Sequence, residues 1–176
     1  MRRAGSCDPP LHELTGHTPL PFKPLDPEFE QRVRASFARQ AVMRTLDVAL
    51  ERIAPGEVHL TLPFRTDLTQ QHAFLHAGVV TAVIDSACGY AALTLMEPGA
   101  AVLSVEFKVQ LLAPARGAWF RSVGRVVRAG RTLTVVMGEL RAITQGPTDG
   151  ATDDGEVVAL MTGTMMTVRD RPDLAD

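Results

Sequence analysis

The chain has 176 residues, of which 45% are apolar and 22% charged, a composition that is typical of a folded domain and excludes general disorder. This length supplies a single domain with a sizeable core. Its 18 basic and 20 acidic residues leave a net charge of −2, which excludes a broad positive field for holding nucleic acid. The two cysteines, Cys7 and Cys88, are too few for a disulfide framework, so a reducing cytoplasm is the expected compartment.

The first 26 residues are rich in proline and have little periodicity. This composition predicts a tail or an extended arm over residues 1–26. Arg2 and Arg3 are followed by polar residues and not by an apolar segment, so no secretory signal peptide is expected.

Two helices are expected. The first spans 27–39, where acidic residues lie near the start and basic residues near the end. The second spans the almost wholly apolar stretch 77–96, which Glu97-Pro98-Gly99 terminates. Asp85 lies near the middle of this stretch and would cost roughly 2.5–3.5 kcal/mol at the centre of a bilayer. The stretch is therefore predicted to be a buried helix of a folded domain and not a membrane span.

Strands are predicted where apolar and polar residues alternate with a period of two. They are expected at 46–54, 58–64, 101–110, 119–127, 132–143 and 157–168. In the strand at 101–110, the alternation places Ser104, Glu106 and Lys108 together on the polar face. The segment 144–155 is rich in Thr, Asp and Gly, which predicts a surface loop.

The order of these elements predicts an α+β fold, in which a curved antiparallel sheet wraps around the helix at 77–96. One domain is expected over 27–170, with a C-terminal tail at 171–176. A helix that is apolar on nearly every side must be buried all round. Its small residues would let another backbone approach closely, and the helix of a second copy is the expected partner. These small residues are Ala77, Gly78, Ala82, Ala87, Gly89, Ala91 and Ala92.

The start of the second helix carries the candidate chemistry. No Ser, Thr, Asp or Asn lies at 74–78 to cap it, so the backbone N–H groups from Ala77 to Val79 are expected to lack side-chain partners. Free donors at the positive end of a helix dipole can bind a developing oxyanion. Asp85 is a carboxylate within the predicted buried helix, and buried titratable groups cluster at functional sites.

Asp85 and Ala77 are too far apart to act together within one chain. Eight residues separate them, which corresponds to about 12 Å along a helix axis. Two antiparallel helices related by a two-fold axis would place each Asp85 beside the Ala77 of the other copy. If the two groups cooperate, the site is therefore expected to be shared by two copies of the chain.

This segment resembles the active-site region of hotdog-fold thioesterases, and in particular the PaaI-type branch, which acts on acyl-CoA esters. That branch has an Asn or Gln, then His-Gly-Gly six residues on, and an Asp nine residues after the His. The matching positions here are Gln70, His76-Ala77-Gly78 and Asp85. The one departure is Ala77, where the family has glycine; alanine keeps the backbone N–H that the family uses.

The resemblance extends beyond this motif. The segments 103–115 and 124–133 are also similar to the family, so the likeness covers residues 40–168. It implies the hotdog fold, a sheet rolled around the long helix, which usually forms dimers and often tetramers.

The resemblance also implies a role for each matching residue. Asp85 would be the catalytic carboxylate, either a general base on water or a nucleophile that forms an anhydride. The N–H of Ala77, with Gly78 beside it, would polarise the thioester carbonyl. Gln70 would position water or that carbonyl, and His76 would orient the turn or touch the thioester. Each residue also has a purely structural alternative. Asp85 would be a buried carboxylate with its hydrogen bonds satisfied, and Ala77 an ordinary frayed start of a helix. Gln70 would be a solvated amide of a loop, and His76 a structural histidine.

Five further residues are candidates for binding the substrate. Ser104 matches a site serine of some relatives, although the alternation places it on the polar face of its strand. Phe74 would line the acyl pocket or belong to the core. Three arginines on a strand–turn–strand suit the phosphates of CoA, or belong to a solvated hairpin. These arginines are Arg125, Arg128 and Arg131.

The sequence therefore predicts a cytoplasmic homodimer or homotetramer that hydrolyses aryl or medium-chain acyl-CoA thioesters to the free acid and CoA. No cofactor is expected, and no metal, because the histidines lack metal-ligand spacing. Neither nucleic acid nor a membrane is an expected partner. Two alternatives remain open. One is a non-catalytic acyl-CoA binding or regulatory module, and the other is a hotdog hydratase or dehydratase, in which the Asp is paired with a His placed differently from His76.

Overall fold

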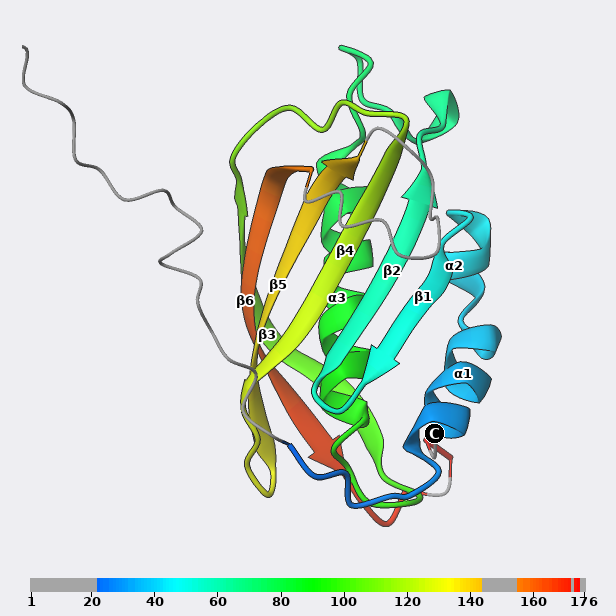
Figure 1. Ribbon diagram of the computed structural model, residues 1–176, viewed down its shortest axis with the longest axis vertical. Helices are drawn as coiled ribbons and strands as arrows, with labels where there is room; N and C mark the ends of the chain where they lie inside the picture. The colour runs from blue at the N-terminus through cyan, green and yellow to red at the C-terminus, as the bar shows by residue number, and fades with distance from the viewer. Residues whose placement is uncertain (1–21, 144–154, 172, 175–176) are drawn as a thin grey trace, which may run out of the picture.

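The computed structural model describes residues 22–143, 155–171 and 173–174 of the chain (Figure 1). Its elements are α1 (Phe29–Arg39), α2 (Ala41–Thr45), β1 (Ala49–Ala54), β2 (Glu57–Pro63), the 3₁₀ turn η2 (Thr66–Leu68), α3 (Ala77–Leu93), β3 (Ala101–Leu111), β4 (Trp119–Arg128), β5 (Leu133–Ile143) and β6 (Glu156–Val168). The six strands form one sheet in the order β1-β2-β4-β5-β6-β3, and all neighbours are antiparallel. The sheet curves around α3, so the predicted α+β fold is confirmed.

Helix α3 lies unusually close to the middle of the sheet. Gly124 of β4 and Gly138 of β5 are register partners beneath it. A Cβ on Gly124 would lie 2.3 Å from the carbonyl carbon of Ala87, and one on Gly138 would lie 2.5 Å from a methyl group of Ile84. The glycine pair therefore allows the helix backbone to touch the sheet. Ala87, which was expected to face a second helix, faces β4 of its own chain.

One side of α3 is not fully covered by its own chain. Ala77 is exposed at the start of the helix, and Thr81, Asp85 and Gly89 are only half-buried. Residues spaced by four lie on one helix face, so these side chains form a stripe. The expectation that a second helix covers this stripe stays a prediction.

The C-terminal end of α3 is held by α1. Arg32 donates hydrogen bonds to the carbonyl oxygens of Leu93 at 2.9 Å, Met96 at 2.9 Å and Glu97 at 2.6 Å. Its guanidinium also forms an ion pair with Asp26 at 3.2 Å, and both side chains are buried. A cation is favourable here because the carbonyl end of a helix carries a partial negative charge.

Two boundaries differ from the sequence prediction. The packed region includes Phe22, whose ring lies 2.6 Å from where a Cβ on Gly56 would be; residues 1–21 of the predicted arm lie outside the described residues. The chain after α1 forms the short helix α2 and reverses at Asp47, which has a φ of 60°. Aspartate tolerates this left-handed conformation, so β1 begins at Ala49 and not at 46.

The other predicted elements match the structure closely. Helix α3 starts at Ala77 and ends before Thr94, whose hydroxyl donates to Ala91 O at 2.6 Å and accepts from Gly56 N–H at 2.7 Å. Within the part of the chain that the structure describes, no helix is long and apolar enough to cross a membrane. The predicted loop at 144–155 lies, apart from Gly155, outside that part.

Candidate active site

The loop before α3 is a tight turn. The carbonyl oxygen of Phe74 accepts from Gln70 N–H at 2.8 Å, and that of Gln70 accepts from Ala73 N–H at 3.0 Å. Ala73 has a φ of 61°, a left-handed conformation that is uncommon for a residue other than glycine. His76 N–H donates to Leu68 O at 2.9 Å, which fixes the entry of the chain into α3. Strained backbone of this kind is found preferentially at functional sites.

The N-terminus of α3 is capped by a histidine. His76 Nδ1 accepts from Gly78 N–H at 2.9 Å, and His76 O accepts from the N–H groups of Val79 at 2.9 Å and Val80 at 3.1 Å. The prediction that the N–H groups from Ala77 to Val79 lack side-chain partners is therefore wrong at Gly78, whereas the acceptor of Val79 N–H is a backbone carbonyl. Ala77 is the exception: its N–H has no acceptor among the described residues. The histidine cap thus leaves the N–H of Ala77 for a ligand. This is the donor that the resemblance to hotdog-fold thioesterases assigns to the thioester carbonyl.

Asp85 is held by Ser104. The Ser104 hydroxyl donates to Asp85 Oδ1 at 2.7 Å, from strand β3 to the half-buried stripe of α3. A β-bulge between Ser104 and Glu106 makes this contact possible, because the inserted residue turns Ser104 toward α3 while Glu106 accepts from Thr164 on the other face. The prediction that Ser104 shares the polar face with Glu106 and Lys108 is therefore wrong.

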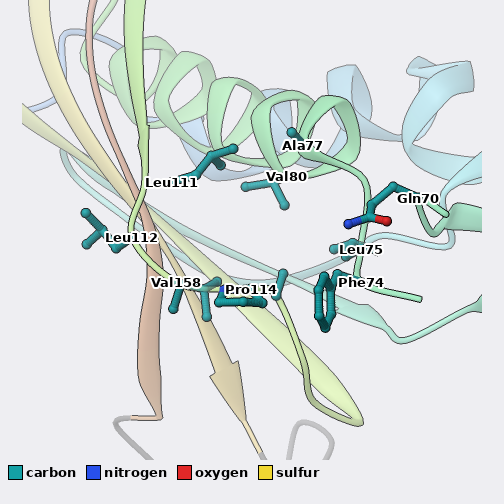
Figure 2. Close-up of a pocket in the computed structure, with 11 residues that line it drawn as sticks. Gln70, Phe74, Leu75, Ala77, Val80, Leu111, Leu112, Pro114 and Val158 are labelled. Carbon is teal, nitrogen blue, oxygen red and sulfur yellow. The ribbon is translucent and has the colours of Figure 1, made fainter. Parts of the chain in front are cut away.

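A pocket of about 330 Å³ opens beside the N-terminus of α3 (Figure 2). Gln70, Phe74 and Ala77 line it on the side of the loop and helix. The opposite side is aliphatic and comes from the β3–β4 connection and the start of β6, with Leu111, Leu112, Pro114 and Val158. The volume lies at the lower end of the range for small-molecule sites. A mainly apolar pocket next to a free backbone donor suits a carbonyl compound with an apolar tail.

Sequence reasoning did not find Arg116. Its guanidinium lies 4.4 Å from the centroid of the Phe74 ring, in a cation–π arrangement at the pocket. The sequence offered one signal for it: Arg116 directly follows the segment 103–115, which resembles the family. Gln70, by contrast, was predicted, and its Oε1 accepts from His72 N–H within the loop.

Within one chain, the site consists of two separate halves. Gln70, Phe74 and Ala77 border the pocket, whereas Asp85 and Ser104 do not line it. Asp85 lies two helical turns further along α3, about 12 Å from Ala77 along the axis. The structure thus brings together the pocket residues and, separately, the carboxylate with its serine.

Comparison with known proteins identifies the family. A model of the thioesterase superfamily matches residues 72–147. A protein of Halobacterium salinarum that bears an esterase name is 33% identical over 130 residues, which covers 71% of this chain and 83% of that protein. The crystal structure of a thioesterase family protein from Silicibacter pomeroyi is 50% identical, with a TM-score of 0.72, and the match covers 80% of this chain and 98% of that chain. The chain belongs to the thioesterase superfamily.

The fold of this thioesterase is shared with PaaI of E. coli, which comes from the phenylacetic acid degradation operon. The two structures have a TM-score of 0.70 at 18% identity, and the match covers 82% of this chain and 96% of PaaI. The resemblance of the sequence to hotdog-fold thioesterases is therefore confirmed. Together the comparisons support a hydrolase that cleaves thioesters in general.

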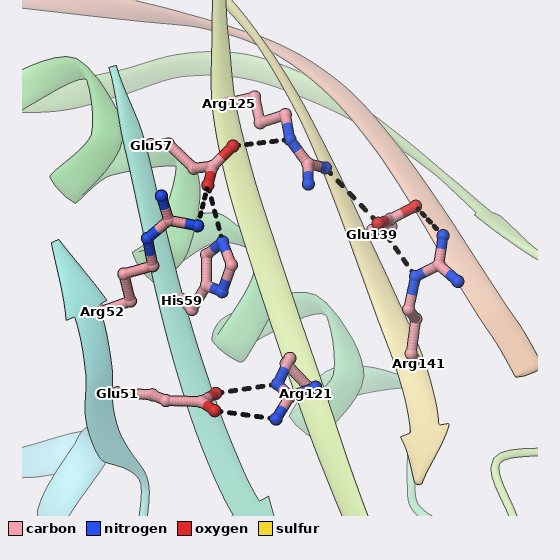
Figure 3. A network of polar contacts seen from close by, with 8 residues as sticks. All are labelled: Glu51, Arg52, Glu57, His59, Arg121, Arg125, Glu139 and Arg141. Atoms are coloured by element: carbon pink, nitrogen blue, oxygen red, sulfur yellow. Dashed lines mark hydrogen bonds and ion pairs between the residues drawn. The ribbon is translucent and has the colours of Figure 1, made fainter. Parts of the chain in front are cut away.

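Arg125 of the thioesterase lies in a charged network on the sheet face away from α3 (Figure 3). It pairs with Glu57 at 2.9 Å and with Glu139 at 3.4 Å. A hydrogen bond from His59 and the charge of Arg125 lower the pKa of Glu57 to about 2, against the opposing effect of burial. Arg125 is thus already paired with two carboxylates, which it shares with Arg52 and Arg141.

The other two predicted arginines lie at the β4–β5 hairpin. Arg128 and Arg131 are both exposed, and Arg131 borders a small cavity of about 110 Å³ near the C-terminal end of α3. Arg169, which sequence reasoning did not single out, borders the same cavity and pairs with Glu97. This end of the molecule therefore carries cationic side chains at a distance from the pocket.

Two further observations bear on the chemistry of the site, one on a cysteine and one on metal ligands. Burial, and after it the charge of Asp85, raise the pKa of the Cys88 thiol to about 12, so this cysteine stays protonated and unreactive. Among the described residues, no three His, Cys, Asp or Glu side chains are grouped so as to hold a metal ion.

Proposed function

We propose that the protein hydrolyses acyl-CoA thioesters to the free acid and CoA, at a site formed by two copies of the chain. One observation carries the proposal: α3 presents at Ala77 a backbone donor that has no acceptor among the described residues and, two turns later, a carboxylate held by Ser104. These are the two groups that thioester hydrolysis needs, an oxyanion donor and a base or nucleophile. They lie too far apart on one helix to reach the same carbonyl group.

Pairing of two chains along β3 would complete the site. In the part of the chain that the structure describes, strand β3 ends the sheet and has β6 as its one neighbour. Val105, Phe107 and Leu111 are large apolar residues exposed on this strand. A long apolar edge strand is prone to pair with another strand. An antiparallel pair of β3 edges would continue the sheet into a second copy and set the two α3 helices side by side, with Asp85 of one near Ala77 of the other.

In the proposed reaction, the thioester carbonyl oxygen accepts a hydrogen bond from Ala77 N–H of one copy. Asp85 of the other copy takes a proton from a water molecule as it attacks, or attacks the carbonyl carbon itself. Ser104 holds Asp85 by donating to Oδ1, which leaves Oδ2 for the reaction. The collapse of the tetrahedral intermediate expels the CoA thiolate. Where Asp85 is the nucleophile, this leaves a mixed anhydride on Asp85, which a water molecule then hydrolyses to release the acid. Gln70, which borders the pocket, would orient the water or the carbonyl.

The two ends of the substrate would lie in different places. The pocket beside Phe74 is apolar and suits an aryl or medium-chain acyl group. The phosphates of CoA would lie at Arg128 and Arg131, which are exposed, and not at Arg125, which is paired with Glu57 and Glu139. Arginine is suited to phosphate because its planar fork can donate two hydrogen bonds at once.

The direct test is release of free thiol from a panel of aryl and aliphatic acyl-CoA esters. Asp85→Asn keeps the size of the side chain and an acceptor for Ser104, and it is expected to lower kcat about 10²–10⁴-fold, the usual contribution of a general base. Asp67→Asn makes the same chemical change at an exposed carboxylate and is expected to leave kcat unchanged. Binding of acyl-CoA without hydrolysis by the wild-type protein would instead indicate a binding module.

A second experiment tests the sharing of the site between copies. Ala77→Pro removes the proposed N–H donor at the first position of α3, where proline is well tolerated and the preceding residue, His76, has a compatible ψ of 137°. Ala77→Pro and Asp85→Asn chains are each expected to be inactive. When the two are mixed and allowed to exchange, half of the dimers would be mixed, and each would hold one intact site, giving about a quarter of the wild-type activity. A mixture that stays inactive although mixed dimers form would refute the shared site.

A further inference from the structure

Arg116 lies beside the pocket and carries a charge that no carboxylate of the described residues balances. Most of the arginines that the structure describes form an ion pair with an Asp or Glu of the same chain. Arg116 is exposed, and its guanidinium carbon lies 4.4 Å from the centroid of the Phe74 ring. An aromatic ring attracts a cation but has no net charge, so Arg116 keeps its charge for a ligand.

The backbone fixes the place of Arg116 at the pocket. Ala115 is buried, and its carbonyl oxygen accepts from Leu75 N–H at 3.2 Å, so the residues next to Arg116 and Phe74 are joined directly. On the other side of the pocket, Val158 O of β6 accepts from two N–H groups of the same β3–β4 connection, at 2.9 and 3.3 Å. The connection is therefore held from both sides, and Arg116 extends from a fixed point beside the Phe74 ring.

The pocket lies between Arg116 and the proposed position of the reacting group. Figure 2 shows Ala77 and Phe74 on opposite sides of the pocket. The lining is otherwise mainly aliphatic, and Gln70 is its one polar side chain among the described residues. A thioester whose carbonyl oxygen accepts from Ala77 N–H would extend its acyl chain along this lining. The far end of that chain would come close to Phe74 and Arg116.

A wholly apolar acyl group is poorly matched to this end of the pocket. A methyl group against Arg116 would remove water from the guanidinium N–H groups without replacing its hydrogen bonds, which is unfavourable. A carboxylate would instead accept two parallel hydrogen bonds from the planar guanidinium. The N–H donors lie in the plane of that group, so the contact of its central carbon with the Phe74 ring leaves donors for a ligand.

We propose that Arg116 selects acyl groups that end in a carboxylate, so that the preferred substrates are thioesters of dicarboxylic acids. This inference rests on the proposed function, because it takes Ala77 as the position of the thioester carbonyl. The methylene chain crosses the aliphatic part of the pocket, and the terminal carboxylate pairs with Arg116. Hydrolysis adds water across the C–S bond and releases a dicarboxylic acid and CoA. Arg116 takes no part in bond cleavage and determines specificity alone.

The phosphates of CoA are the other anions that could pair with an exposed arginine. They lie on the opposite side of the thioester from the acyl group, and the proposed function places them at Arg128 and Arg131 on the β4–β5 hairpin. Arg116 instead contacts Phe74, which lines the pocket proposed for the acyl group. Esters of pantetheine distinguish the two anions, because they keep the thioester and lack the nucleotide and its phosphates.

The test compares two acyl groups of equal chain length, adipoyl and hexanoyl, each as the CoA ester and as the pantetheine ester. Arg116→Met removes the charge and keeps an unbranched side chain. It is expected to lower kcat/KM about tenfold for both adipoyl esters and to leave both hexanoyl esters unchanged. Arg44→Met makes the same change at an exposed arginine of α2 that does not line the pocket, and it is expected to leave all four values unchanged.

Three results would overturn the proposal. Equal losses for the two CoA esters, absent from the pantetheine esters, would show that Arg116 binds the phosphates of CoA. Equal losses for all four esters would show that Arg116 only holds Phe74 and the loop in place. No loss for any ester would show that the far end of the acyl group does not reach Arg116.

Failure of the proposed function would give a different result, in which the wild-type protein hydrolyses none of the four esters. The comparison is then made by calorimetry with S-hexyl-CoA and its ω-carboxy counterpart, which are thioethers and cannot be hydrolysed. A Kd that Arg116→Met raises about tenfold for the carboxylate alone would support the selectivity of Arg116 in a protein that binds acyl-CoA without cleaving it. A Kd for the carboxylate that Arg116→Met does not change would overturn that selectivity.

Discussion

Gly124→Ala is expected to be strongly destabilising, because the added methyl group meets the backbone of α3. A Cβ at this position would lie 2.3 Å from the carbonyl carbon of Ala87, 2.4 Å from its oxygen and 2.5 Å from the nitrogen of Cys88. Ordinary Cβ contacts are 3.4–4 Å, so the helix must move away from the sheet by about 1 Å. Overpacking costs typically 1–3 kcal/mol, and a clash with backbone lies at the upper end, so we expect a loss of about 3 kcal/mol.

Two other glycines provide matched comparisons. A methyl group on Gly138 collides with side-chain atoms, of Ile84 at 2.5 Å and of Cys88 at 2.6 Å, which can partly move aside, and its backbone neighbour, Val123 O, lies at an ordinary 3.6 Å. Gly138→Ala is therefore expected to cost less, about 1–2 kcal/mol. Gly89 lies within α3, and a Cβ there meets nothing within 4 Å among the described residues of its own chain, so Gly89→Ala is expected to stabilise the separated chain by roughly 0.5–1 kcal/mol. A loss of stability in the assembled protein would instead indicate that the second α3 helix packs on this residue.

The free energy of unfolding can be measured for all three variants by urea denaturation followed by far-ultraviolet circular dichroism. The chain concentration must be held constant, because association of copies contributes to the stability. Displacement of α3 would also separate Asp85 from Ser104, so folded Gly124→Ala protein is expected to lose thioesterase activity. If Gly124→Ala were no more destabilising than Gly138→Ala, the contact between the helix backbone and β4 could not be what sets the position of α3.

Four further predictions follow from the same structure. Arg32→Met leaves Asp26 and three carbonyl groups without their buried partner and is expected to cost about 3–5 kcal/mol, measured as a lower thermal midpoint. Ser104→Ala is expected to reduce kcat more than it reduces stability, because the hydroxyl holds the Asp85 carboxylate that we propose to react. Arg131→Ala is expected to raise KM for an acyl-CoA several-fold and to leave KM for the matching acyl-pantetheine unchanged, because only the former carries the nucleotide phosphates. The pKa of Glu57 is lowered from 4.5 to about 2, so its contribution to stability is present above pH 4.5 and is lost as the pH falls toward 2; Glu57→Gln is expected to flatten this part of the acid unfolding curve.

The strands could be predicted from the sequence because one face of the sheet is packed on α3. Every second side chain of a strand lies on that face, so apolar residues alternate with polar ones. The alternation fails at β3, where one inserted residue forms the bulge after Ser104. A period of two assumes an unbroken ladder, so every assignment of a face beyond a bulge is reversed. Ser104 was for this reason assigned to the polar face, although the structure turns it toward Asp85.

The helix cap shows a second limit of local sequence reasoning. The residues considered as caps were those with short oxygen-bearing side chains, and none is present at 74–78. The ring nitrogen of His76 takes their place, which only the geometry of the turn could show. The ion pairs of Arg125 were likewise not predictable, because its partners Glu57 and Glu139 come from other strands of the sheet.

The cap also explains which of the two residues after His76 is better as glycine. A Cβ on Gly78 would lie 3.0 Å from His76 Nδ1, the atom that accepts the Gly78 N–H, so the imidazole would have to shift by a few tenths of an ångström and its hydrogen bond would weaken. Ala77 has no such constraint: it occupies the first position of α3, is exposed and lines the pocket. This chain departs from the His-Gly-Gly pattern at Ala77. A methyl group at this position leaves both the His76 cap and the Ala77 N–H donor in place. The methyl group borders the pocket, so its effect is expected on the shape of the acyl group that the site accepts and not on the ability of the helix to stabilise an oxyanion.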